Sequence, residues 1–145
     1  MELIVRRAEA SDYMTLSRLS ESWESENITY GLKANAIEDL ESAEIWVADE
    51  EGLIAGYLLG EVRNNKGLAV FEETDEAYFE IEEIYVHPAH RSKGYGSALI
   101  QHVTELMNQR GITRMTVSTA NKNWQKVMAF YQKHGFNSWT MTLYK

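Results

Sequence analysis

A cluster of glycines and basic residues is the part of this sequence best suited to hold a phosphorylated ligand. It reads Arg91-Ser92-Lys93-Gly94-Tyr95-Gly96-Ser97. Because glycine lacks a Cβ, successive backbone N–H groups can turn toward one anion and approach it closely. The apolar spacing that follows predicts a helix from about Ser97 to Gly111, and the N–H groups at its start would add to an anion site. We therefore expect a phosphate-binding corner here.

The residues before this corner predict a strand that ends at Val86, because they are mostly β-branched or aromatic and Pro88 lacks an N–H. Three carboxylates lie on this strand: Glu80, Glu82 and Glu83. The apolar residues around them are spaced three and then two apart, which predicts a β-bulge near Glu82–Glu83. A carboxylate here has the chemistry to act as a general base; the alternative is a set of solvated charges that protect an edge strand.

Other nucleotide and metal sites fit the sequence less well. A dinucleotide fingerprint needs a third glycine where Leu99 stands, and no G-K-[ST] follows to make a Walker loop. A domain that binds the phosphates of another nucleotide stays an alternative. The chain has no cysteine and its four histidines are scattered, so we expect no disulfide and no metal.

The strand, glycine turn and helix resemble the GNAT superfamily of N-acetyltransferases. The superfamily's acetyl-CoA motif [RQ]-x-x-G-x-[GA] matches the segment from Arg91 to Gly96, and the segment from Ala129 to Phe136 is similar to its "A-x-FYEKLGF"-like motif. With an R-x-A-x-x-x-D opening at Arg6, the resemblance covers nearly the whole chain. It implies direct transfer of an acetyl group from acetyl-CoA, as co-substrate, to a primary amine.

The resemblance also implies roles for single residues. Those that would bind the cofactor are Ile84, Tyr85, Val86, Arg91, Ser92, Lys93, Gly94, Tyr95, Gly96, Ser97 and Asn123. The family often has an asparagine at the position that Trp124 occupies here, and the neighbouring Asn123 would take over its contact. Tyr131 would protonate the leaving thiolate, unless it is one more core aromatic. The family's bases correspond to Glu80 and Glu82, with Glu83 as a further candidate. Trp23 and Tyr30 lie in the region that lines the acceptor pocket.

Charge is distributed unevenly along the 145 residues. The net charge is −8, but residues 1–86 carry 21 acidic and 6 basic side chains, whereas residues 87–145 carry 1 acidic and 8 basic. The basic half suits a polyanion such as CoA, and the acidic half favours a cationic small-molecule amine and repels nucleic acid. The alternative to both interpretations is that these charges lie on exposed faces and serve only to keep the chain in solution. Within the same chemistry, the rival acceptor is a protein N-terminus or lysine. The rival class of function is a non-catalytic CoA-binding regulatory module.

The element order predicts one domain over residues 1–145 with an α+β (mixed α/β) fold. We expect strands at 2–8, 44–49, 53–62, 78–86 and 114–118, a hairpin extension at 68–71 before the acidic run 72–76, and one or two closing strands at 136–144. Helices are expected from 13, at 35–42, from 97 and at 124–134. The resemblance implies a GNAT acyl-CoA N-acyltransferase fold: a mostly antiparallel six- to seven-stranded sheet, its fourth and fifth strands splayed, with helices on both faces. With no apolar run near ~20 residues and no signal peptide, we expect a cytoplasmic protein without membrane partners, and a second copy of the chain is a candidate partner.

Overall fold

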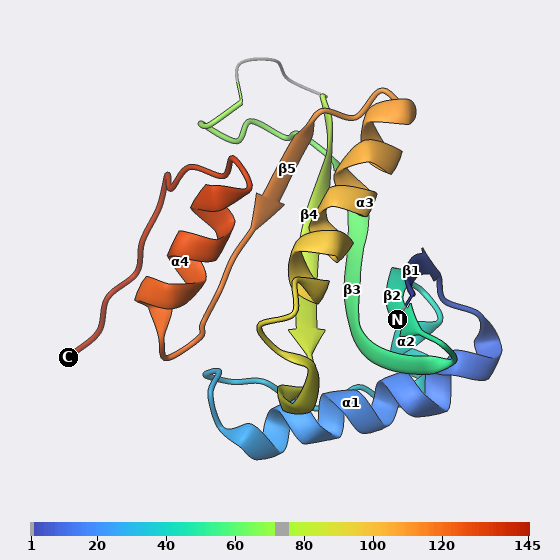
Figure 1. The fold of residues 1–145 in the computed structure, drawn as a ribbon. Helices are drawn as coiled ribbons and strands as arrows, with labels where there is room; N and C mark the ends of the chain where they lie inside the picture. Colours follow the sequence, from blue (N-terminus) through green and yellow to red (C-terminus); the bar gives the residue numbers. More distant parts are fainter. Residues whose placement is uncertain (1, 72–75) are drawn as a thin grey trace.

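The computed structural model of the protein describes residues 2–71 and 76–145 as a curved sheet with helices on both faces (Figure 1). Most of the acidic run that the sequence analysis placed after a hairpin lies outside these residues. The elements are β1 (Leu3–Arg7), η1 (Ala10–Asp12), α1 (Tyr13–Glu26), α2 (Ile37–Leu40), β2 (Glu44–Glu50), β3 (Leu53–Asn64), β4 (Ala77–Val86), η2 (Pro88–His90), α3 (Tyr95–Gln109), β5 (Arg114–Val117) and α4 (Trp124–Lys133).

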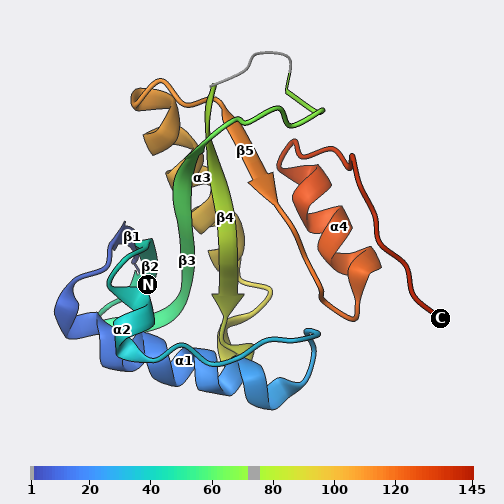
Figure 2. The same cartoon turned by 180° about the vertical axis from the view of Figure 1, so that it is seen from behind.

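The sheet has five strands in the described residues, in the order β1-β2-β3-β4-β5, and only β4 and β5 run parallel. The expected six or seven strands were therefore too many. Residues 136–144 form no strand, because after α4 the chain runs along that helix and meets no strand to pair with (Figures 1 and 2). Residues 68–71 form a turn instead of extending the hairpin: the Phe71 N–H donates to the Leu68 carbonyl (3.1 Å). Just before it, the Asn65 side chain accepts hydrogen bonds from the N–H groups of Gly67 (3.0 Å) and Leu68 (2.7 Å).

The predicted β-bulge lies at Glu82. Leu59 of β3 is opposite Glu83 and Gly60 is opposite Ile81, so Glu82 has no partner in the ladder. The extra residue resets the alternation of side chains along β4. Ile81 before the bulge and Ile84 after it consequently both pack on the α3 side, as does Val86.

The expected divergence of the fourth and fifth strands is also present. The parallel ladder of β4 and β5 runs only from Tyr78 opposite Arg114 to Ile81 opposite Val117. β5 ends there, whereas β4 continues to Val86. The backbone edge of the last part of β4 is thus not paired with β5.

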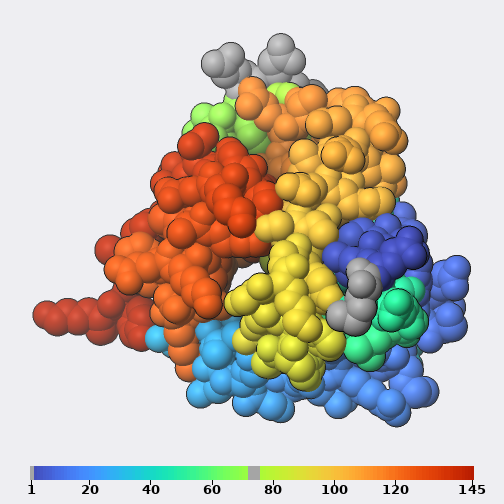
Figure 3. Space-filling model, viewed as in Figure 1, coloured from blue at the N-terminus to red at the C-terminus, as the bar shows by residue number. Residues whose placement is uncertain are grey.

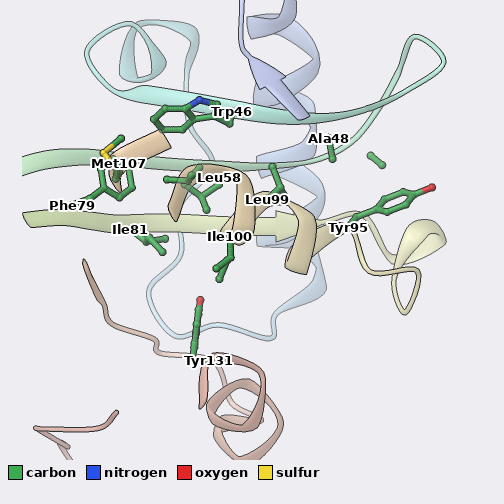
Figure 4. Close-up of a cluster of buried hydrophobic side chains, with 12 residues drawn as sticks. Trp46, Ala48, Leu58, Phe79, Ile81, Tyr95, Leu99, Ile100, Met107 and Tyr131 are labelled. Atoms are coloured by element: carbon green, nitrogen blue, oxygen red, sulfur yellow. The ribbon is translucent and has the colours of Figure 1, made fainter. Parts of the chain in front are cut away.

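Each face of the sheet has its own apolar cluster. On one face α1 and α2 cover β2, β3 and β4, with Leu16, Leu40 and Tyr57 among the fully buried residues. On the other face α3 lies over the same strands (Figure 4). Each buried leucine or phenylalanine there stabilises the fold by ~1.5–3 kcal/mol. Tyr131 of α4 reaches the edge of this second cluster, so α4 is fixed beside α3.

Candidate active site

The glycine-rich corner forms a left-handed turn at the start of α3. Gly94 has φ +84° and precedes the first helical residue, Tyr95, so the helix begins two residues before the predicted position. The first intrahelical bond runs from the Ala98 N–H to the Gly94 carbonyl, 3.0 Å. In the described chain the N–H groups of Tyr95, Gly96 and Ser97 have no acceptor. Three free donors at a positive helix end suit a phosphate group.

Gly96 serves a different purpose from Gly94. It is helical, and a Cβ added there would lie 3.3 Å from the Phe130 ring of α4. Next to it, the Ser97 hydroxyl and the His134 Nε2 are 2.9 Å apart. These contacts hold α4 against the first turn of α3, and they place the segment that carries Tyr131 beside the corner.

The two basic residues of the corner are in different environments. The Arg91 guanidinium donates to the Val86 carbonyl (2.9 Å) and pairs with Glu26 of α1 at 2.8 Å. It also lies 5.5 Å from the centre of the Tyr85 ring, whose hydroxyl donates to Glu26. Lys93 is exposed and has no ion-pair partner within residues 2–71 and 76–145. Lys93 therefore offers an uncompensated positive charge, and Arg91 braces the corner against α1.

A buried carboxylate anchors the corner from the other side. Tyr95 donates its hydroxyl hydrogen bond to Glu50, at the end of β2, and the Glu50 side chain is only 7% exposed. The His90 ring stacks on Tyr95, and its buried Nδ1 is 3.9 Å from the same carboxylate with no hydrogen-bond partner in the described chain. The start of α3 is thus tied to the β2–β3 hairpin.

An opening passes through the molecule next to the corner. Figure 3 shows it between the segment around the end of β4 and the start of α3 (yellow) and the segment that leads into α4 (orange), with the end of α1 (light blue) below. The chain after α1 closes the lower side: the Tyr30 N–H donates to the Ala120 carbonyl (3.0 Å), and the Lys122 N–H to the Ile28 carbonyl (2.8 Å). The opening coincides with the divergence of β4 from β5.

Tyr131 is the titratable residue that α4 contributes to this region. Its side chain is buried, with 9% exposure, and points from α4 toward Ile100 and the α3 cluster (Figure 4). Burial raises the pKa of Tyr131 to about 12, so the phenol stays protonated at neutral pH. Among the described residues no group accepts a hydrogen bond from its hydroxyl. A protonated phenol without a partner is able to donate to a ligand atom.

The three glutamates of β4 are held in two ways. Arg63 of β3 forms ion pairs with Glu80 and with Glu82, the latter at 3.1 Å. Glu80 is level with the β4–β5 ladder, opposite Thr116, whereas Glu82 lies at the bulge beyond the last pair. Glu83 instead faces α1 and α2. Its carboxylate accepts hydrogen bonds from Tyr57 and from Asn35, and burial raises its pKa above the ordinary value.

The remaining candidates lie around the lower side of the opening. Trp23 stacks on Tyr85 at a centroid distance of 5.1 Å and donates to the Thr29 hydroxyl at 3.1 Å. Tyr30 is 54% exposed, and the Lys122 ammonium lies over its ring. Asn123 is the N-cap of α4, where its side chain accepts from the Lys126 N–H.

Sequence reasoning missed the partners that orient these groups. Glu26, Asn35 and Glu50 come from the acidic half of the chain, and no local pattern marks them.

Across the part of the chain that the structure describes, no three histidines, cysteines or carboxylates cluster to hold a metal ion. No helix in the described ranges has both the length and the apolar character needed to cross a bilayer.

Comparisons with known proteins give the family. The model of the Acetyltransferase (GNAT) family matches residues 6–136, and the chain belongs to this family. It is an N-acetyltransferase, and members of this family generally use acetyl-CoA. A search of curated protein sequences found no match.

Solved structures share the fold at low identity. An acetyltransferase of Trypanosoma brucei is 19% identical with a TM-score of 0.73, covering 99% of both chains. A ribosomal-protein-alanine N-acetyltransferase of Brucella melitensis biovar Abortus 2308 is 16% identical with a TM-score of 0.71, also covering 99% of both. An aminoglycoside acetyltransferase from an uncultured soil metagenomic sample is 18% identical, TM-score 0.74, over 99% of this chain and 95% of that one.

Proposed function

We propose that this N-acetyltransferase transfers the acetyl group of acetyl-CoA directly to a primary amine of a cationic small molecule. The observation that carries the proposal is the opening where β4 leaves β5, next to three N–H groups at the start of α3 that have no acceptor within the described residues. The free donors suit the diphosphate of CoA, and the free edge of β4 suits an extended pantetheine arm, which would lie along it as an added strand.

The proposed chemistry needs a proton acceptor and a proton donor. Glu82 would take the proton that the amine loses as its nitrogen bonds to the acetyl carbon, through water or directly. Tyr131 would give its proton to sulfur as the carbon–sulfur bond breaks. The position of Glu82 beyond the last β4–β5 pair favours it over Glu80, which is level with Thr116. General acid–base groups of this kind contribute ~10²–10⁴-fold in rate.

The remaining residues would bind and orient. Lys93 would contact phosphate by its charge, and Ser92, Gly94, Tyr95, Gly96 and Ser97 through the main chain. Ile84, Tyr85 and Val86 would line the arm of the co-substrate, with Asn123 across the opening. Trp23 and Tyr30 would contact the acceptor. The acceptor is proposed to be cationic because residues 1–86, which include α1 and β4, carry 21 acidic and 6 basic side chains.

The alternative acceptor is a protein N-terminus or lysine, and the similar folds include both a ribosomal-protein and an aminoglycoside acetyltransferase. The deciding experiment measures acetyl-CoA consumption with a panel of polyamines, aminoglycosides, amino-alkyl metabolites and peptides with free N-termini or lysines. We expect turnover with a cationic small molecule. Turnover with peptides alone would overturn the acceptor class.

A variant separates catalysis from binding. Tyr131→Phe should lower kcat by ~100-fold, because the proton donor at sulfur is lost, while calorimetry should show CoA binding with little change. Tyr13→Phe, which removes a phenol from the first turn of α1, is the matched control and should keep full activity. Unchanged kcat in Tyr131→Phe would exclude the proposed role. A preference for ATP or NAD over CoA in the same calorimetry would overturn the assignment of the corner.

A further inference from the structure

A histidine that follows α4 contacts the first turn of α3, where the proposed diphosphate site lies. The His134 Nε2 and the Ser97 hydroxyl oxygen are 2.9 Å apart. Ser97 also carries one of the N–H groups at the start of α3 that have no acceptor within the described residues. The imidazole is therefore one hydrogen bond away from a residue that the proposed function assigns to phosphate.

His134 is a departure of this sequence from the motif that it otherwise follows. In the A-x-FYEKLGF-like pattern the residue before the last glycine is leucine, and here that residue is His134. A leucine side chain packs, but it neither donates nor accepts a hydrogen bond. An imidazole does both, and it changes its charge close to neutral pH. His134 therefore has abilities that the motif residue lacks.

The surroundings of His134 allow its ring to gain a proton from solvent. The ring is half-buried and lies edge-on to Phe130, with ring centres 5.0 Å apart. The charged side chains that face it in the described chain are Lys133, next to it in sequence, and Glu105 of α3, which lines the same groove. Burial and the Lys133 charge lower the pKa of His134, so the ring is neutral in the free protein at neutral pH.

The protonation state of His134 decides how the Ser97 hydroxyl is used. A neutral ring whose Nε2 lacks a proton accepts a hydrogen bond from Ser97, and the hydroxyl proton then points at the ring. A protonated ring donates from Nε2, so the Ser97 oxygen accepts and its own proton is free to turn to another acceptor. The charge of the protonated ring, close to the start of α3, also attracts a diphosphate.

We propose that His134 is a positioning residue for acetyl-CoA, which binds most tightly when the protonated ring donates to Ser97 and the Ser97 hydroxyl donates to the diphosphate. The inference rests on the proposed function, because it needs the diphosphate to bind at the start of α3. Binding then takes up one proton from solvent at the His134 ring. The gain in affinity is absent where the ring is neutral with and without CoA, and it is fully present where the ring is charged in both states.

The test compares the Kd of CoA in the native chain and in His134→Gln by calorimetry, from mildly alkaline to mildly acidic pH. Glutamine keeps an amide N–H for Ser97 but cannot take up a proton. We expect the native chain to gain ~5-fold in affinity over His134→Gln as the pH falls through this range, the effect of one nearby charge and one hydrogen bond. The CoA phosphates titrate in the same range, but they cancel in the ratio of the two Kd values. His102→Gln makes the same change further along α3 and should follow the native chain.

Proton uptake gives an independent readout. Titrations with CoA in two buffers of different ionisation enthalpy count the protons that are taken up on binding. The native chain should take up more protons than His134→Gln at neutral pH. Ser97→Ala should show a smaller gain in affinity at low pH, because only the charge of the ring remains to act. An undiminished gain in Ser97→Ala would overturn action through Ser97.

The outcomes separate this inference from the proposed function. If the native chain and His134→Gln bind CoA with the same pH dependence and the same proton uptake, the contact between His134 and Ser97 serves packing alone, and only the inference is overturned. If CoA binds neither chain at any pH, both proposals are overturned. Far-UV circular dichroism shows whether each variant is folded. His134→Leu restores the motif residue and replaces His134→Gln if the latter does not fold; its comparison with the native chain should change with pH in the same sense.

Discussion

The Tyr57 hydroxyl donates a hydrogen bond of 2.8 Å to the Glu83 carboxylate on the face of the sheet that α1 and α2 cover. The same carboxylate accepts the Asn35 amide at 2.9 Å. One side chain therefore joins β3 and β4 to the segment that leads into α2. Burial raises the pKa of Glu83, and the two hydrogen bonds only partly oppose this effect. The carboxylate is consequently a structural anchor whose charge is costly.

A pH-dependent stability difference follows from this raised pKa. The folded chain binds the Glu83 proton more tightly than the unfolded chain, whose value is the ordinary 4.5. The protonated form therefore gives stability that is fully present below pH 4.5 and is lost as the pH rises through the folded pKa. Relative to Glu83→Gln, the native chain should become more stable as the pH falls, by about 1.4 kcal/mol for each unit by which the pKa is raised.

Urea unfolding of both proteins between neutral and mildly acidic pH measures this difference. Glu41→Gln, an exposed change after α2, should show no such dependence and controls for the loss of one charge. A difference between the native chain and Glu83→Gln that stays constant with pH would contradict the assignment.

The local parts of this fold were predictable from the sequence, and the long-range ones were not. Apolar spacing around Glu82 predicted the bulge, because an extra residue changes a period of two within a few positions. The two glycines predicted a tight turn before the helix, and the structure has a left-handed turn at Gly94, whereas Gly96 packs against Phe130. No local signal, by contrast, marks the pairing of Glu26 with Arg91, which are 65 positions apart.

The closing strands illustrate the same division. The alternation of Trp139, Met141 and Leu143 is typical of a strand, but the predicted strand does not form, because a strand also needs a neighbour. The sequence does not say whether that neighbour lies in the same chain. In the described chain it does not, which is why five strands form where six or seven were expected.

The phosphate-binding role of the corner is tested by two glycines in equivalent conformations. Gly94 has φ +84° and Gly111 has φ +81°, and a Cβ added at either meets no atom within 4 Å. Valine at either position should cost a similar ~1–2 kcal/mol of backbone strain. Only Gly94→Val should fill the space beside the free N–H groups of α3, and it should weaken CoA binding at least ~10-fold, or 1.4 kcal/mol.

Calorimetric titration with CoA, together with thermal unfolding, separates the two effects. Gly111→Val is the matched control: it should lose the same stability and bind CoA as the native chain does. Equal affinities of the two variants would mean that the phosphates bind elsewhere.

The base is assigned by comparing two neighbouring carboxylates that share one partner. Glu80 and Glu82 both pair with Arg63, so changing either to glutamine removes one ion pair from the same guanidinium. Glu82→Gln should lower kcat/KM by ~100-fold, because the proton acceptor is lost. Glu80→Gln should change it only slightly. A larger loss in Glu80→Gln would transfer the role to that residue, and near-native rates in both would exclude the pair.

The native Glu26 carboxylate should oppose cofactor binding, so that its removal tightens binding, even though Glu26 is not proposed to touch the cofactor. Its carboxylate pairs with Arg91 at 2.8 Å and so places a negative charge beside the corner. Glu26→Gln should release the Arg91 charge toward the diphosphate and tighten CoA binding by about 1 kcal/mol, or about fivefold in Kd. The gain should shrink as salt is added, because both side chains are partly exposed, 19% for Glu26 and 38% for Arg91. Glu21→Gln makes the same change of charge on an exposed position of α1 and should have little effect. Weaker binding in Glu26→Gln, with the fold retained, would instead show that the Glu26–Arg91 pair is needed to hold the corner in its binding conformation.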